Sequence, residues 1–139
     1  IRDQPRSRGL GDVYKRQEVC FDNATRANLG GLSHKERIFL GVSLLHRYKN
    51  SRLDTQHEKV LGLLTIEELK EAEILGKAMR FGAMFSTMDA DIPAKLHWDL
   101  EKRIIRLTLS PKSRGLYGEV VHARFLSLAK SMKSGIEVL

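Results

Sequence analysis

The chain has 139 residues, of which 42% are hydrophobic and 29% charged, so it can build one compact core but not two ordinary ones. No apolar stretch approaches the roughly 18 residues of a membrane span, and the single cysteine, Cys20, excludes an internal disulfide bond. We therefore expect a cytoplasmic protein with no membrane segment. The formal net charge of +7 makes polyanions candidate partners, because a basic surface attracts phosphates.

Residues 1–17 differ from the rest of the chain in composition. They hold five basic and two acidic side chains with almost no apolar periodicity, and their Pro, Ser and Gly residues disfavour a helix or strand. The segment is similar to the translated adapter sequence found at the start of reading frames assembled from environmental DNA. We predict a non-native or disordered leader here and one domain over residues 18–139. The alternative is a native basic arm that binds polyanions.

A capping box predicts a first helix that starts at Ser33. In this motif the hydroxyl of Ser33 accepts a hydrogen bond from a free backbone N–H, and the carboxylate of Glu36 reaches back to the chain. Apolar side chains then recur at helical spacing over residues 38–45. Basic side chains follow, where they suit the negative end of the helix dipole, and Asn50–Ser51 is expected to stop the helix.

Thr65 and Glu68 form a second capping box, which predicts a helix that continues to about Thr87. The leucines at 61–64 predict a short turn before it. This helix is expected to be buried on most sides, because a broad apolar surface runs along it. The expected inward stripe is Leu69, Ala72, Leu75, Met79 and Ala83, with Ile74, Ala78, Phe81 and Phe85 beside it.

The apolar period then changes from that of a helix to two. Apolar residues alternate with polar ones over 96–100 and again over 105–109, which predicts two strands of a hairpin with its turn near Glu101–Arg103. A lone hairpin is marginal in water, so it must pack on the helices. The last run, from Tyr117 to about Met132, predicts a third helix. The expected fold class is α+β and mainly helical. The expected inward stripe of the third helix is Val121, Phe125, Leu128, Ala129 and Met132.

No catalytic constellation is visible in the sequence, and we predict neither catalytic nor metal-binding residues. The histidines have no metal-ligand spacing, one cysteine cannot supply a zinc knuckle, and no nucleophile elbow or P-loop is present.

Cations form the strongest remaining signal. His46, Arg47, Lys49 and Arg52 make a positive patch at the end of the first helix, which could hold phosphate oxygens or could be only a solvated helix end. Arg80 lies within the most apolar helix, where a guanidinium needs a partner or an exit to water. It is either a buried structural pair or the rim of a polar channel.

Four segments resemble the C-terminal region of the exopolyphosphatase / guanosine pentaphosphate phosphohydrolase (Ppx/GppA) family. They are Gly31–Arg37, Leu44–Tyr48, Ile74–Gly82 and Arg124–Ala129, and their order and spacing carry the resemblance more than any one of them. With the hairpin, the resemblance covers nearly all of residues 21–132.

The resemblance implies an incomplete HD-like helical domain with a small β-hairpin and a C-terminal helix. In the family, two actin-like N-terminal domains hold the phosphate-binding loops, the divalent-metal site and the catalytic glutamate. The C-terminal domain helps to form a basic passage for polyphosphate and a dimer contact. The late helix here reads Met79-Arg80-Phe81 where an active HD domain needs an aspartate. The implied function is therefore that of an accessory domain, inactive alone and without its own cofactor, whose parent uses Mg²⁺ to remove terminal phosphate from polyphosphate or guanosine pentaphosphate.

Two other functions stay open at this point. The chain could be a small basic nucleic-acid-binding module, although aromatic residues are only 6% of the sequence and mostly fall at expected core positions. It could also be purely a dimerisation element. We expect a homodimer that meets inorganic polyphosphate or guanosine pentaphosphate through the parent enzyme, with no membrane or nucleic-acid partner. The passage residues would be His46, Arg47, Lys49, Arg52 and Arg80.

Overall fold

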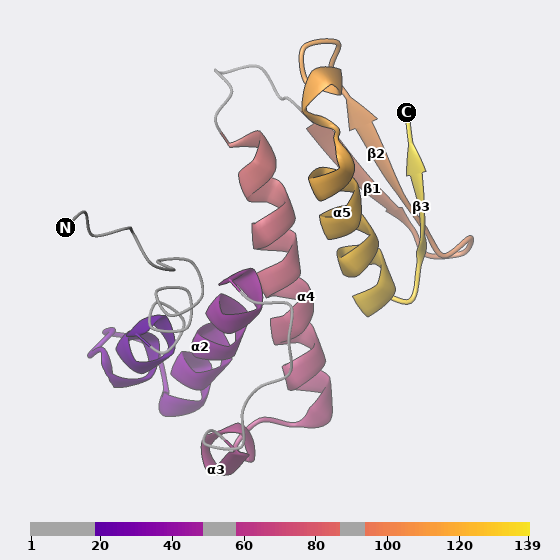
Figure 1. The fold of residues 1–139 in the computed structure, drawn as a ribbon. Helices are drawn as coiled ribbons and strands as arrows, with labels where there is room; N and C mark the ends of the chain where they lie inside the picture. Colours follow the sequence, from indigo (N-terminus) through magenta and orange to yellow (C-terminus); the bar gives the residue numbers. More distant parts are fainter. Residues whose placement is uncertain (1–18, 49–57, 87–93) are drawn as a thin grey trace, which may run out of the picture. The chain divides into compact units, whose positions relative to one another are not determined.

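The computed structural model describes residues 19–48, 58–86 and 94–139, and their fold is α+β and mainly helical, as predicted (Figure 1). The chain divides into two compact units, Ile1–Gly76 and Lys77–Leu139, and helix α4 contributes residues to both. A helical segment covers residues 19–26. The other elements are α2 (His34–Tyr48), α3 (Glu58–Leu61), α4 (Ile66–Gly82), a 3-10 turn (Ala83–Phe85), β1 (Ala94–Asp99), β2 (Ile104–Leu109), a second 3-10 turn (Arg114–Leu116), α5 (Glu119–Ser131) and β3 (Gly135–Val138).

Both predicted capping boxes are formed. The Ser33 N–H donates to Glu36 Oε2 at 2.7 Å, and the Glu36 N–H donates to Ser33 Oγ at 3.2 Å, at the start of α2. At the start of α4 the Thr65 N–H donates to Glu68 Oε2 at 2.9 Å, and the Glu68 N–H donates to Thr65 Oγ1 at 3.1 Å. The two hydrogen bonds of each capping box satisfy two backbone N–H groups that a helix start would otherwise leave without a partner. This confirms where the two helices begin.

The first unit holds a small core among the segment 19–26, α2 and α4. Two glycines let these helices come close. A Cβ built on Gly41 would lie 2.9 Å from Cδ2 of Phe21, and one on Gly76 would lie 2.2 Å from the carbonyl oxygen of Ser43. Gly41 thus leaves room for the ring of Phe21, and Gly76 lets the backbones of α4 and α2 approach each other. The buried core residues of this unit are Phe21, Ile38, Val42, Leu64 and Ala72.

The predicted inward stripe of α4 is wrong in part. Ala72 is buried, and so are Phe81 and Phe85, which were expected beside the stripe, but Leu75 is 41% exposed and Ala83 is exposed. Ala72 and Phe81 are nine residues apart, about two and a half helical turns, so they lie on opposite faces of the helix. Each end of α4 therefore buries a different face, whereas one broad apolar surface was expected along the whole helix.

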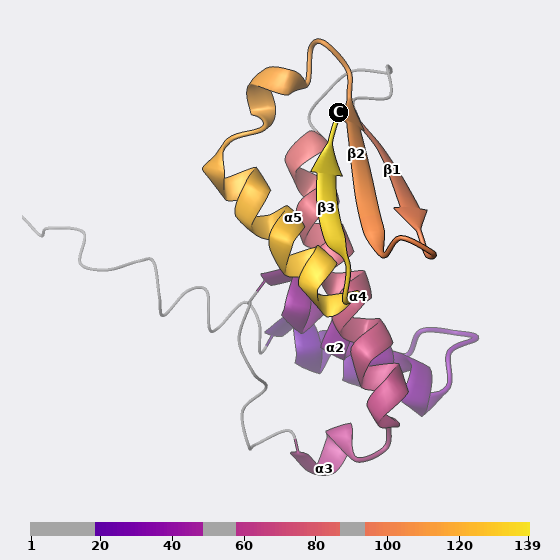
Figure 2. The same cartoon turned by 90° about the vertical axis from the view of Figure 1, so that its right-hand side faces the viewer.

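The second unit contains a three-stranded sheet in the order β1-β2-β3. The predicted hairpin is confirmed, because β1 pairs antiparallel with β2 and places Trp98 opposite Ile105. Strand β3 was not predicted; it pairs parallel to β2, with Ile136 beside Ile105. Helix α5 lies beside β3 along one face of the sheet in both views (Figures 1 and 2).

The core of this unit lies between α5 and the sheet. Alternate residues of β2 are buried, and the predicted inward stripe of α5 is buried from Val121 to Ala129, while Met132 follows the helix as its C-cap. Trp98 and Leu96 share the face of Ile105, yet they are 42% and 50% exposed because β1 is an edge strand. The buried residues are Ile105, Leu107, Leu109, Val121, Phe125, Leu128 and Ala129.

The opposite face of the sheet is polar. Arg106 on β2 donates from Nε to Glu137 on β3, and its Nη1 lies 3.7 Å from Asp99 on β1. One guanidinium thus links all three strands. In the part of the chain that the structure describes, no helix is long and apolar enough to cross a membrane.

Candidate functional site

The predicted passage residues fall in different parts of the molecule. His46 and Arg47 lie in the last turn of α2, in the first unit, and Arg80 lies in the last turn of α4, in the second. Lys49 and Arg52 lie outside the described residues, as does the predicted leader 1–17.

The end of α2 is held against α4 through Gly76. A Cβ on Gly76 would lie 2.5 Å from Cβ of His46 and 3.0 Å from the backbone nitrogen of Arg47, so the backbone of α4 fits against the last turn of α2. This contact fixes the direction in which the side chains of that turn leave the helix.

Arg47 is a half-buried cation without a carboxylate partner among the described residues. Its guanidinium carbon lies 5.5 Å from the ring centroid of Tyr48, a cation–π distance, and Tyr48 is 43% exposed. The charge also suits the negative end of the α2 dipole. The guanidinium can offer hydrogen-bond donors to an anion at this helix end.

The guanidinium of Arg124 reaches the backbone of Arg80, a contact that was not predicted from the sequence. Arg124 on α5 donates from Nη1 to the carbonyl oxygen of Arg80 at 3.4 Å, and the same nitrogen lies 2.7 Å from Sδ of Met84. Burial, and next the positive charge of Arg124, lower the pKa of Arg80. Arg124 is far from Arg80 in sequence, so only the packing of α4 against α5 brings them together.

Two other hydrogen-bonded pairs lie near the start of α5. The hydroxyl of Tyr117 and Nδ1 of His122 are 2.9 Å apart, and the hydroxyls of Ser110 and Ser113 are 2.5 Å apart. Burial raises the pKa of Tyr117. Each pair joins residues close in sequence and fixes the chain between β2 and α5, so both have a structural role.

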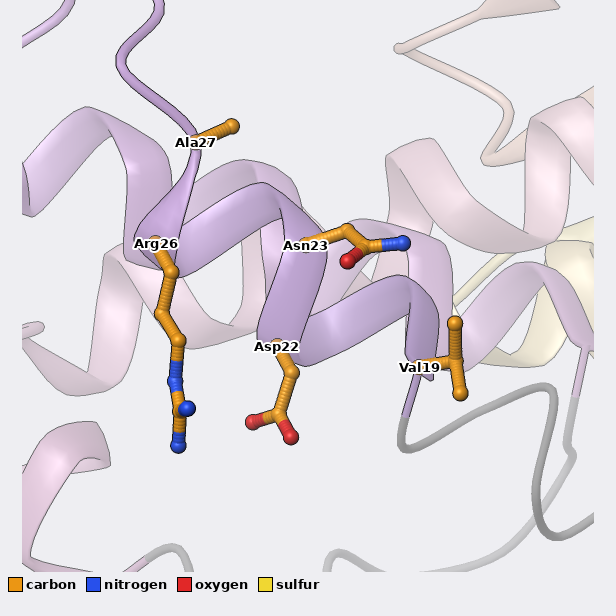
Figure 3. Close-up of a pocket in the computed structure, with 5 residues that line it drawn as sticks. All are labelled: Val19, Asp22, Asn23, Arg26 and Ala27. Atoms are coloured by element: carbon orange, nitrogen blue, oxygen red, sulfur yellow. The ribbon is translucent and has the colours of Figure 1, made fainter.

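A hollow of about 520 Å³ lies along the segment 19–26 and the residue after it. The described residues that line it follow one another along a single helical segment, and Figure 3 shows them along one side of it. Converging polar groups from several elements are what distinguish a binding site, and the described lining does not supply them. These residues are Val19, Asp22, Asn23, Arg26 and Ala27.

Metal ligands do not gather in the described ranges: no group of three or more His, Cys, Asp or Glu side chains there could hold an ion. No family model matches the sequence, and no curated protein matches it.

Proposed function

We propose that the chain is the C-terminal accessory domain of an exopolyphosphatase of the Ppx/GppA type, with an incomplete HD-like helical part. Its role is to guide polyphosphate, or guanosine pentaphosphate, toward catalytic domains that are not in this sequence. The observation that carries the proposal is Arg47, whose backbone is held by the contact of α2 with Gly76 and whose guanidinium lies over the Tyr48 ring without a carboxylate among the described residues.

The physical argument rests on charge. Polyphosphate carries negative oxygens along its length, and a guanidinium binds such oxygens through charge-assisted hydrogen bonds. Residues 18–139 carry a net charge of +4, the total of +7 less the +3 of residues 1–17, which attracts the polyanion from a distance, and neighbouring cations bind successive phosphates. His46, Arg47, Lys49 and Arg52 form the first contact in this proposal, and Arg80 forms a second.

The same proposal covers catalysis, metal binding and assembly. The catalytic glutamate and Mg²⁺ belong to the actin-like domains of the parent, the isolated chain does not release phosphate, and two copies form a cytoplasmic homodimer. Size-exclusion chromatography with light scattering at several concentrations tests the dimer, and phosphate release from polyphosphate by the purified chain contradicts the accessory role.

Binding of long-chain polyphosphate tests the central claim. We expect the double variant Arg47→Glu/Lys49→Glu to bind at least about tenfold more weakly than the wild-type chain and to show a smaller dependence of affinity on salt. The matched control is Lys70→Glu/Lys130→Glu, which makes the same charge change at exposed positions of α4 and α5. Equal weakening in both variants, or none in either, removes the passage assignment.

The nucleic-acid alternative requires aromatic rings that can stack on bases. Within the ranges that the structure describes, the rings of Tyr48 and Trp98 are exposed by about two fifths. Arg47 lies over the Tyr48 ring, and the Trp98 indole N–H donates to Ser134 Oγ at 3.1 Å, so both rings already have protein contacts. Competition between single-stranded RNA and polyphosphate separates the two functions, because the passage requires polyphosphate to displace RNA.

A further inference from the structure

The last turn of α4 and the middle of α5 form a seam whose geometry is set by aromatic packing. The rings of Phe81 and Phe125 stack with their centroids 5.0 Å apart and their planes at 19°. One turn before Arg80, Lys77 Nζ donates to the carbonyl oxygen of Ser127 at 3.4 Å. The seam therefore holds the last turn of α4 and the middle of α5 next to each other (Figures 1 and 2). Arg124 thereby reaches the backbone carbonyl of Arg80.

Arg80 and Arg124 place two positive charges at this seam. Across the described ranges, neither Arg80 nor Arg124 forms an ion pair, and both side chains are half-buried. The carbonyl end of α4 supplies only about half of a negative charge, so two guanidiniums leave an excess of about one and a half positive charges. This excess is larger than a helix end requires.

Donors remain available on both side chains. A guanidinium has five N–H groups, and the hydrogen bonds of Arg124 within the described residues use Nη1 only. One ligand can therefore accept hydrogen bonds from Nε and Nη2 of Arg124 and from the guanidinium N–H groups of Arg80. Two planar forks suit a tetrahedral oxyanion, which presents several acceptor oxygens in different directions.

We propose that Arg80 and Arg124 together bind one phosphoryl group of a condensed phosphate at the seam between α4 and α5. The ligand neutralises the charge excess, and Arg124 becomes a binding residue as well as a contact of the α4 carbonyl end. This site rests on the proposed function for its biological ligand, but its chemistry requires only the two guanidiniums of the second unit.

Inorganic pyrophosphate, titrated into the full chain and followed through the arginine side-chain Nε–H signals, tests the site directly. We expect the signals of Arg80 and Arg124 to shift together along one saturable curve. Arg80→Gln and Arg124→Gln are each expected to weaken binding by about tenfold, the loss of one charged hydrogen-bond partner. Lys130→Gln, an exposed position of the same helix, is the charge-matched control and is expected to change affinity by less than about twofold.

Arg124 also contacts the end of α4, so its variant requires a check on the fold. Arg124→Lys retains the charge but loses the fork, and it is expected to leave the melting temperature closer to wild type while restoring only part of the affinity. Wild-type Arg80 and Arg124 signals that do not move with pyrophosphate overturn the site whatever the variants do. Equal affinity of the wild type and both Gln variants overturns it too.

The outcomes also separate this site from the passage function. If pyrophosphate shifts both arginines while long-chain polyphosphate binds no better than RNA, the seam site stands and the passage fails. If polyphosphate binding depends on Arg47 and Lys49 while pyrophosphate leaves the signals of Arg80 and Arg124 unmoved, the first contact of the passage stands and the seam site is wrong.

Discussion

The two units bring their helices together by opposite means. In the first unit, contact depends on missing side chains, because a Cβ on Gly41 would clash with the ring of Phe21 and a Cβ on Gly76 with the backbone of α2. In the second unit, contact depends on large side chains, because Phe81 and Phe125 stack and fill the seam between α4 and α5. Close-packed interiors tolerate neither added nor removed volume, but the two kinds of contact fail under opposite substitutions.

The two kinds of helix contact also place the arginine side chains of the two units in different surroundings. Contact at Gly76 places Arg47 at the end of a helix, beside an exposed tyrosine ring. The ring packing of the second unit instead holds Arg80 and Arg124 beside each other and partly out of water. The first arrangement suits a flexible polyanion that passes along a surface, and the second suits a single phosphoryl group.

Removing the aromatic ring of Phe125 should give the largest effect on stability. This side chain is fully buried and stacked on Phe81, so Phe125→Ala is expected to lower the free energy of unfolding by about 3–5 kcal/mol. Urea denaturation measures the loss. Leu126→Ala, at the next position and 45% exposed, is the control and should lose far less.

Hydrogen exchange on the Phe125→Ala variant sharpens the comparison of the units. We expect the amides of α5 and the sheet to lose protection while those of α2 keep most of theirs, because the ring belongs only to the second unit. Equal loss of protection in α2 and α5 contradicts an energetic boundary within α4.

Adding one methyl group at Gly76 should have the next largest effect. The Cβ would lie 2.2 Å from a backbone oxygen, which cannot rotate away, so Gly76→Ala is expected to cost about 1–3 kcal/mol. The same variant should also weaken polyphosphate binding, because it moves the helix end that carries Arg47.

Gly82 provides the matched control in the same helix. It has helical dihedral angles, and a Cβ there would meet nothing within 4 Å, so Gly82→Ala should stabilise the chain by about 0.5–1 kcal/mol. Urea midpoints of the two variants that move in the same direction contradict the role assigned to Gly76.

Helices and strands could be predicted where residues close together in the sequence specify them. The starts of α2 and α4 followed from capping boxes, in which hydrogen bonds join residues three positions apart, and the hairpin followed from strict alternation. Strand β3 was missed because it has four residues and pairs with a strand distant in sequence. The turn before β3 contains a residue in the left-handed conformation, a position where glycine usually signals the turn in the sequence. Here that residue is Lys133, with φ +49°.

Candidate site residues could be predicted only where neighbouring residues in the sequence give the signal. His46 and Arg47 were visible as basic residues at a helix end, and Arg80 as a cation in an apolar helix. Arg124 gave no comparable signal, since a basic residue in an amphipathic helix is ordinary. Its contact with Arg80 arises from helix packing, as does the close approach at Gly76.

Acidification should produce the smallest effect, and in the first unit it should act at the two helix starts. Hydrogen bonds from the backbone N–H and hydroxyl of Ser33 lower the pKa of Glu36, and the Lys35 side chain and next the Thr65 backbone lower that of Glu68. Each lowered pKa contributes stability that is present above the ordinary carboxyl pKa and is lost as the pH falls through the folded value. We therefore expect the urea midpoint to fall between about pH 5 and pH 2, with a smaller fall in the variant Glu36→Gln/Glu68→Gln, because glutamine keeps an acceptor that does not titrate over this range. Glu67→Gln, next to the second capping box but not part of it, should retain the wild-type pH dependence; a flattened curve for this control would show that general charge, and not the two helix starts, sets the response to acid.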